Sequence, residues 1–209
     1  TVFAMQVVGV SAASKTTTMA ATGAAQGKYD VEAMSQSEVA DVAKVNQTAA
    51  DLIKDINAGT KTLEDLAKAE SSIASEIEGK SLVTAFMDLR KIGDVSKTAD
   101  GKYQVTLSVP ALTKGMTDVK VLHFSTARNV WEVITPSNVD LNNKELTFEV
   151  QDLSPIAIIA KVDASQAVTN TTGTSPKTGV DSTNTVPFAG AAVVLLGAAA
   201  VVAFRKKNA

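Results

Sequence analysis

Residues 102–109 read Lys-Tyr-Gln-Val-Thr-Leu-Ser-Val and alternate between polar and apolar side chains. Successive side chains of a strand point to opposite faces, so this pattern predicts a β-strand with one face in a hydrophobic core. Asp100-Gly101 before it is a turn signal, and Pro110 after it ends the strand. The predicted partner strand is residues 82–89.

More short strands are predicted toward the C-terminal side of this stretch. They are expected at residues 119–125, 130–134, 145–150 and 156–162. The last of these is almost continuously apolar, which predicts a central strand covered on both faces. About six short strands separated by turns predict a small antiparallel β-sandwich or open barrel at residues 80–163. Its large core residues are expected to be Phe86, Phe124, Trp131 and Phe148.

Upstream of the strands, residues 31–79 follow the period of an α-helix and predict a hairpin of two helices. Ser35 and Glu38 form a capping-box pattern at the first helix, and Asn57-Ala58-Gly59 ends it. A second helix is expected from Thr62 to Gly79. The buried positions are expected to be Val42, Val45, Ala49, Leu52, Ile53, Ile56, Leu63, Leu66, Ala67, Ile73 and Ile77.

The first thirty residues divide into two parts. Residues 1–13 are apolar and end in small side chains, which predicts the remainder of a signal peptide, so the sequence is expected to begin inside its own signal. A short N-terminal strand is the alternative. Residues 14–30 have no hydrophobic period and are predicted to be flexible.

The C-terminal end is the most apolar part of the chain. Residues 186–204 carry no charge and predict a transmembrane helix of roughly 28 Å, close to the thickness of the hydrocarbon layer. Arg205, Lys206 and Lys207 follow it, within residues 205–209. Because positively charged flanks stay in the cytoplasm, the rest of the chain is expected to lie outside.

Residues 164–185 are predicted to form a disordered linker, and they contain a short motif. The motif is Ser175, Pro176, Lys177, Thr178 and Gly179. The order of Pro-x-Thr-Gly, apolar helix and basic cluster resembles the sortase sorting signal of Gram-positive bacteria. The family pattern usually opens with Leu where this chain has Ser175, which bears on the sortase class that reads it.

The resemblance implies a covalent anchor. A sortase cysteine would cut between Thr178 and Gly179 and join the Thr178 carboxyl to an amine of the peptidoglycan cross-bridge. The expected partners are therefore a sortase, the cross-bridge and, transiently, the membrane, and the expected location is the cell wall. An uncleaved single-pass membrane protein is the alternative.

A second resemblance lies in the strand-rich part. The stretches Val121-Leu-His-Phe, Trp131-Glu-Val-Ile and Leu153-Ser-Pro-Ile are similar to small β-domains of exported Gram-positive proteins that end in the same kind of tail. This resemblance supports the fold and the location and implies no activity.

Composition excludes several kinds of chemistry. The chain has 209 residues and a formal net charge of -2, so no basic field indicates nucleic-acid binding. It has no Cys, which excludes thiolate catalysis, disulfides and Cys-bound metals. His123 is the only histidine, and no Gly-x-Ser-x-Gly turn accompanies it. It is expected to be structural or exposed, and nothing fixes Asp118 or Asp140 beside it as metal ligands.

No catalytic, cofactor or metal site is predicted. Glu132, Asp140, Glu145 and Glu149 could supply paired carboxylates, as any acidic strand face could. The sequence therefore predicts a non-enzymatic interaction or structural module, with a small wall-associated hydrolase as the alternative. The 16 residues from Asp163 to Thr178 reach roughly 55 Å when extended, which predicts a position close to the wall.

Overall fold

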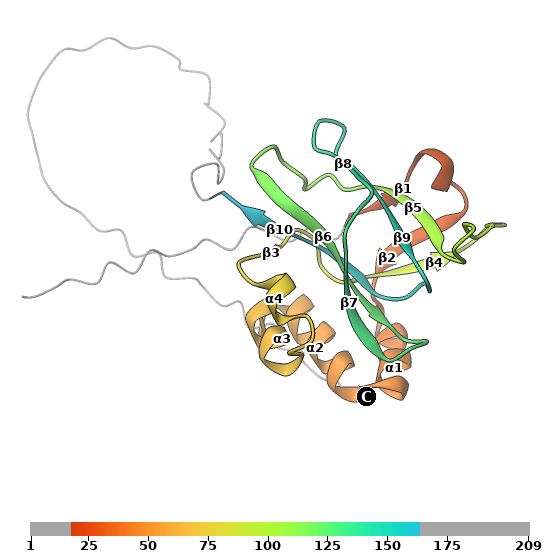
Figure 1. The fold of residues 1–209 in the computed structure, drawn as a ribbon. Coiled ribbons are helices and arrows are strands. Elements are labelled where there is room, and N and C mark those ends of the chain that lie inside the picture. Colours follow the sequence, from red (N-terminus) through yellow and green to blue (C-terminus); the bar gives the residue numbers. More distant parts are fainter. Residues whose placement is uncertain (1–17, 164–209) are drawn as a thin grey trace, which may run out of the picture. The chain divides into compact units, whose positions relative to one another are not determined.

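The computed structural model describes residues 18–163, which all fall in one compact unit (Figure 1). The signal remnant, linker, sorting motif, terminal helix and basic tail predicted above lie outside the described residues. The described part is α+β, with four α-helices and two antiparallel sheets. None of its helices has the length and apolar character needed to cross a membrane.

The strands are divided between a large and a small sheet. The large sheet has the order β2 (Tyr29–Ala33), β4 (Met87–Lys91), β10 (Ile156–Val162), β6 (Met116–Ser125) and β7 (Val130–Ile134), and β3 (Ser81–Leu82) pairs with β10. The small sheet has the order β1 (Ala20–Ala21), β5 (Tyr103–Ser108), β9 (Glu145–Val150) and β8 (Asn138–Asp140).

The helices occupy the segment between β2 and β3. They are α1 (Gln36–Val45), α2 (Gln47–Ala58), α3 (Leu63–Ala69) and α4 (Ala74–Ile77), and a short 3-10 helix, η1 (Gly23–Ala25), precedes β2. Residues 31–33 belong to β2, so the segment 31–79, predicted to be helical, begins inside the large sheet.

The alternating patterns predict the positions of the strands well, but the partner predicted for the strand at 102–109 is wrong. Strands are confirmed within 102–109, 119–125, 130–134, 145–150 and 156–162. The central strand is confirmed too, because β10 lies between β4 and β6 and is fully buried from Ile156 to Ala160. Residues 82–89, however, contribute to β3 and β4 of the large sheet, whereas β5 pairs with β1 and β9. Alternation shows which face of a strand is buried, but not which strand lies beside it.

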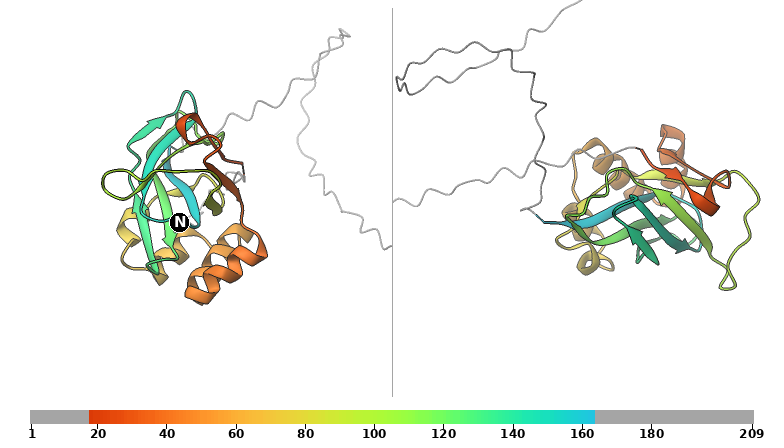
Figure 2. Two further views of the ribbon diagram at one scale, coloured as in Figure 1. Left: turned by 90° about the vertical axis from the view of Figure 1, so that its right-hand side faces the viewer. Right: turned by 90° about the horizontal axis from the view of Figure 1, so that it is seen from above.

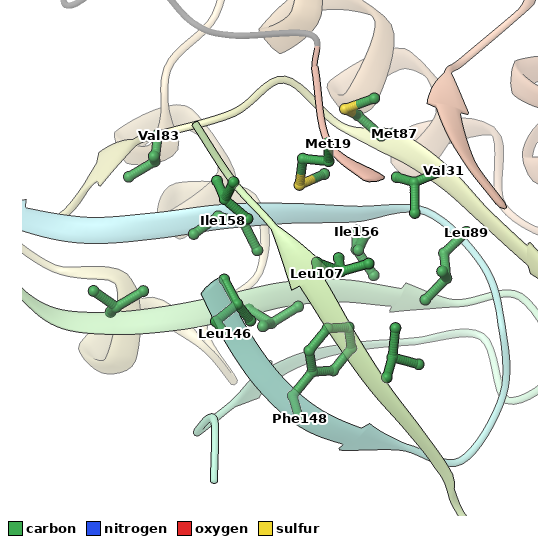
Figure 3. Packing of buried hydrophobic residues seen from close by; sticks show 14 of the residues in the cluster. Met19, Val31, Val83, Met87, Leu89, Leu107, Leu146, Phe148, Ile156 and Ile158 are labelled. Carbon is green, nitrogen blue, oxygen red and sulfur yellow. The ribbon is translucent and has the colours of Figure 1, made fainter. Parts of the chain in front are cut away.

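One hydrophobic cluster fills the space between the two sheets (Figure 3). Leu107, Leu146 and Phe148 enter it from the small sheet, and Ile156 and Ile158 from the large sheet. Because side chains alternate along a strand, the residues between them on β10 face the other way. The large sheet therefore packs against the small one through half of its side chains.

A second cluster joins the helices to the opposite face of the large sheet. Phe86, Phe124 and Trp131 are buried there, with the Trp131 ring centroid 5.7 Å from that of Phe86 and 5.1 Å from that of Phe124. Together with Phe148 in the first cluster, these are the four predicted large core residues, and all are confirmed as buried. The result is three layers, with the large sheet between the helices and the small sheet (Figure 2).

Each predicted helix is in fact two helices. Asn46 adopts an extended conformation (φ -152°, ψ 105°) between α1 and α2, and its side chain accepts a hydrogen bond from Ala49 N at 3.0 Å. Because the helix is interrupted at Asn46, the apolar positions of α1 and α2 do not form one continuous buried face. Val45, predicted to be buried, is 42% exposed. The capping box of Ser35 and Glu38 is confirmed. The second predicted helix divides into α3 and α4 in the same way.

Residues 18–30 are ordered, so the predicted flexibility of 14–30 is wrong over the described part. Met19, Ala25 and Tyr29 are buried in the cluster between the sheets. Ala20 and Ala21 pair with Ser108 and Leu107 at the edge of the small sheet. This segment is stabilised by contacts with residues distant in the sequence. Such contacts do not require a regular hydrophobic period within the segment itself.

Asn57 fastens the end of α2 to the segment before β4. Its side chain donates to Phe86 O at 3.0 Å and accepts from Phe86 N at 2.7 Å. We expect Asn57→Ala to lower the free energy of unfolding by about 2 kcal/mol, because two main-chain groups lose their partner. Urea denaturation of residues 14–178 would measure it. Asn142→Ala, at an exposed turn position, is the control and should change stability by less than about 0.5 kcal/mol; equal effects would contradict this role.

Candidate functional site

The sorting-motif residues Ser175 to Gly179 and the basic residues Arg205 to Lys207 lie outside the described residues. The structure does show where the last described strand ends. Strand β10 ends at Val162, and Asp163 N donates to Gly115 O at 3.1 Å. The described residues therefore end directly after the central strand of the large sheet.

Within residues 18–163, a dense polar cluster surrounds the only histidine. It consists of His123, Ser125, Arg128, Glu132, Asp152 and Ser154, which we call the His123 network. Strand β6 supplies the first two, the β6–β7 turn and β7 supply the next two, and the loop before β10 supplies the last two. Three separate segments of the chain therefore meet at this point.

His123 lies at the centre of the network and is completely buried. Its Nδ1 is 3.1 Å from Glu132 Oε2, and its Nε2 is 2.7 Å from Ser154 Oγ. A buried imidazole needs partners for both nitrogens, and in this domain both have one. Of the two positions expected for His123, the exposed one is wrong.

Arg128 supplies the positive charge of the network. It donates through Nη1 and Nη2 to the two carboxylate oxygens of Glu132, at 2.5 and 2.6 Å, and through Nε to Asp152 Oδ2 at 3.0 Å. Paired donors of this kind favour an ionised carboxylate. The Arg128 hydrogen bonds, with a further contribution from His123, lower the pKa of Glu132 to about 2. The same pairing raises the pKa of Arg128.

Asp152 connects the loop before β10 to the other members. Its Oδ2 accepts from Ser125 Oγ at 2.9 Å, and its Oδ1 accepts from Ser154 Oγ at 3.2 Å. Ser125 Oγ in turn accepts from Arg128 N at 3.1 Å. These bonds fix the loop against the β6–β7 turn, just where the chain enters the central strand.

The series Ser154–His123–Glu132 has the order of a catalytic Ser-His-acid triad. A nucleophilic serine must be reached by substrate, however, and Ser154 is only 3% exposed. The imidazole behind it is completely enclosed, and neither of two cavities in residues 18–163 is lined by a member of the network. The geometry is that of a polar cluster with a buried centre, His123, and a partly exposed edge, Arg128 and Glu132, which holds three segments together.

The other candidate residues from the sequence are dispersed. Asp118 is paired with Lys80, Lys120 and Lys161, which lowers its pKa chiefly through the Lys80 hydrogen bond. Asp140 accepts from Asn142 N and Asn143 N in the β8–β9 turn, and the Asn143 bonds lower its pKa.

None of the four candidate carboxylates lines either of the two cavities described. Asp140 and Glu145 are register partners on β8 and β9, whereas Glu132 lies on the large sheet with Arg128. Glu149 lies on β9 opposite Gln104. Among the described residues, no group of three or more His, Asp or Glu side chains is placed to hold a metal ion.

Sequence reasoning missed Arg128 and Asp152 as members of the network. Arg128 lies in the tight turn between β6 and β7, four residues before Glu132 on β7, so their contact follows once the two strands are known to pair. Asp152 lies 24 residues from Arg128, and no local pattern connects them. Only the packing of β10 beside β6 brings the two side chains together.

The lowered pKa of Glu132 predicts a specific acid sensitivity. Its ordinary value is 4.5 and its folded value is about 2, so its ionic bonds contribute stability above pH 4.5 and are lost as the pH falls toward 2. We expect Glu132→Gln to unfold at a lower temperature than wild type at neutral pH, with the difference narrowing through this interval. Calorimetry from pH 7 to 2 measures both curves, and parallel curves would contradict the assignment.

Comparison with known proteins finds no matching family model, curated protein or solved structure.

Proposed function

We propose that this chain is an exported surface protein that a sortase joins covalently to peptidoglycan, and that its folded part is a non-catalytic interaction or structural module near the wall. The observation that carries the proposal is the order of signals in the last 35 residues. Pro176, Thr178 and Gly179 precede an uncharged apolar run, and three cations follow that run. Each signal alone is common, but their order and spacing are those of a sorting signal.

The physical roles of the three signals fit together. The apolar run is long enough to span the bilayer, and the cations hold its end on the cytoplasmic side. The motif is then retained at the outer face, where a transpeptidase can attack the Thr178 carbonyl. Cleavage releases Gly179 and everything after it, and the new bond forms between the Thr178 carboxyl and a cross-bridge amine.

Three features of residues 18–163 support a binding or structural role. The fold has its own hydrophobic clusters on both faces of the large sheet. The only histidine has both nitrogens hydrogen-bonded inside the domain. The last described residue is Asp163, and the 16 residues from it to Thr178 would reach roughly 55 Å if fully extended. If Thr178 is joined to peptidoglycan, a tether of this length would keep the domain close to the wall.

A wall-associated hydrolase is the second candidate, and one observation favours it. Ser154, His123 and Glu132 are hydrogen-bonded in series. Activity would require the loop at 151–155 to move away, because Ser154 is 3% exposed. Since that loop is held by Asp152 and Arg128, the structural role is the better-supported one.

The proposal is tested in cells that lack sortase. In wild-type cells the protein should stay with the murein after boiling in detergent and appear only after muramidase digestion. In sortase-deficient cells it should be extracted by detergent alone, as a larger form that retains residues 179–209. Retention on boiled murein in both strains would overturn the proposal, and detergent extraction from both would favour the uncleaved membrane protein.

A further inference from the structure

A cavity of about 340 Å³ opens at the end of the domain where η1, the β4–β5 connection and strand β5 meet. None of its lining residues belongs to the His123 network. Its lining residues are Ala24, Ala25, Lys28, Tyr29, Asp94, Val95, Ser96, Lys97, Thr98, Gln104 and Thr106. The volume is at the lower end of the range for small-molecule sites.

The walls of this cavity are fixed by main-chain contacts. Lys28 O accepts from Ile92 N at 2.9 Å and from Gly93 N at 3.2 Å. Gly93 lies so close to the η1 side that an added Cβ would be 2.7 Å from Gly27 O, so the approach requires glycine. On the other side, Thr22 N donates to Thr106 O at 3.0 Å. The cavity is therefore largely formed before a ligand arrives.

Tyr29 gives this cavity a feature that packing alone does not explain. The side chain is 3% exposed, and its Oη makes no hydrogen bond with any other residue of the described range 18–163. A buried hydroxyl without a partner is uncommon and destabilises the fold. Phenylalanine would pack equally well at this position without that cost. Because Tyr29 is also one of the residues that line the cavity, a ligand bound there is a candidate for the missing partner.

The rim of the cavity adds polar side chains that also lack hydrogen-bond partners among the described residues. Within the described residues, the side chains of Lys28, Asp94, Ser96 and Gln104 form no hydrogen bond or ion pair. They comprise both donors and acceptors, which suits a ligand with several hydroxyls. Lys97 extends over the Tyr103 ring at 4.6 Å and adds a second ammonium. Two ammoniums against one carboxylate favour an anionic ligand.

We propose that this cavity binds a hydroxyl-rich anion, that is, a sugar or polyol that carries a single carboxylate or phosphate. Tyr29 Oη bonds a ligand hydroxyl inside the cavity, and Lys28 at the rim holds the acidic group. This inference rests on the proposed function in one respect only: a domain tethered near the wall would meet such ligands in the glycan strands and the anionic polymers.

The test is binding to the full chain in detergent micelles, measured by calorimetry. The probes are N-acetylmuramic acid, glycerol 3-phosphate and the neutral N-acetylglucosamine, which lacks only the lactyl acid of the first. We expect at least one anion to bind about tenfold or more tightly than the neutral sugar, as charge complementarity predicts. The two anions distinguish a glycan source from a polyol phosphate source.

Variants separate a binding role from a packing role. Tyr29→Phe should weaken anion binding about tenfold while the unfolding temperature stays equal or rises, because an unpartnered hydroxyl is removed. Lys28→Gln should abolish the preference for the anion, and Lys68→Gln, beside a different cavity, should bind as wild type does. The proposal is overturned if neither anion binds, if the neutral sugar binds equally well, or if Tyr29→Phe binds unchanged. None of these failures affects wall attachment, which is measured separately in cells.

Discussion

Replacing Thr178 by Ala should reduce the covalently attached fraction of the protein by about a hundredfold or more. A sortase would form its acyl intermediate on the Thr178 carbonyl, so it must bind this side chain in the transition state. A pocket shaped for a β-branched hydroxyl side chain discriminates strongly against a methyl group, and the loss appears in turnover. The measurement is immunoblotting of boiled murein before and after muramidase digestion.

The chain contains its own matched control for this experiment. Thr172 is also followed by a glycine, Gly173, but Asn170 stands where the motif has proline. Thr172→Ala should therefore attach as wild type does, and the Thr178→Ala protein should collect in the membrane fraction at its full length. Equal attachment of the two variants would show that Thr178 is not the acyl donor.

Phe124→Ala should destabilise the domain more than Asn57→Ala does. Phe124 is completely buried on the face of the large sheet that the helices cover, and its ring lies 5.1 Å from that of Trp131. Truncation removes buried surface and leaves a cavity, at a cost of about 3–5 kcal/mol. That is a large part of the roughly 5–15 kcal/mol that stabilises an ordinary domain.

Urea denaturation of residues 14–178 measures this cost with two signals. Far-UV circular dichroism follows the helices and strands, and the fluorescence of Trp131 follows the contact between the two layers. We expect both signals to shift together, because the helices and the large sheet share one hydrophobic cluster. Ile92→Ala, at a side chain 59% exposed, is the control and should change little. A loss below about 1 kcal/mol for Phe124→Ala would contradict the packing of the helices on the large sheet.

Local patterns in the sequence predict local structure in this chain. Alternation along 102–109 and 145–150 predicts the strands β5 and β9, and the capping box at Ser35 predicts the start of α1. The apolar run at 156–162 predicts the central strand β10. In each case the physical cause, a buried face or a satisfied helix end, lies within a few residues of the pattern.

What the sequence does not predict depends on distant partners. Residues 18–30 have no period of their own and become ordered through β5 and the core between the sheets. The sequence around Asn57 predicts the end of a helix, but it does not predict that the Asn57 side chain hydrogen-bonds the main chain of Phe86. The His123 network and the unpartnered Tyr29 Oη arise only when separate segments meet. No spacing along the chain encodes such contacts.

If the sorting signal works as proposed, the mature protein ends at Thr178 in the wall. Mass spectrometry of the C-terminal peptide, after muramidase release and proteolysis, decides whether it does. We expect a peptide that ends in Thr178 and carries the mass of cross-bridge atoms on its carboxyl group. An unmodified peptide that continues through Gly179 into the apolar run would contradict covalent anchoring.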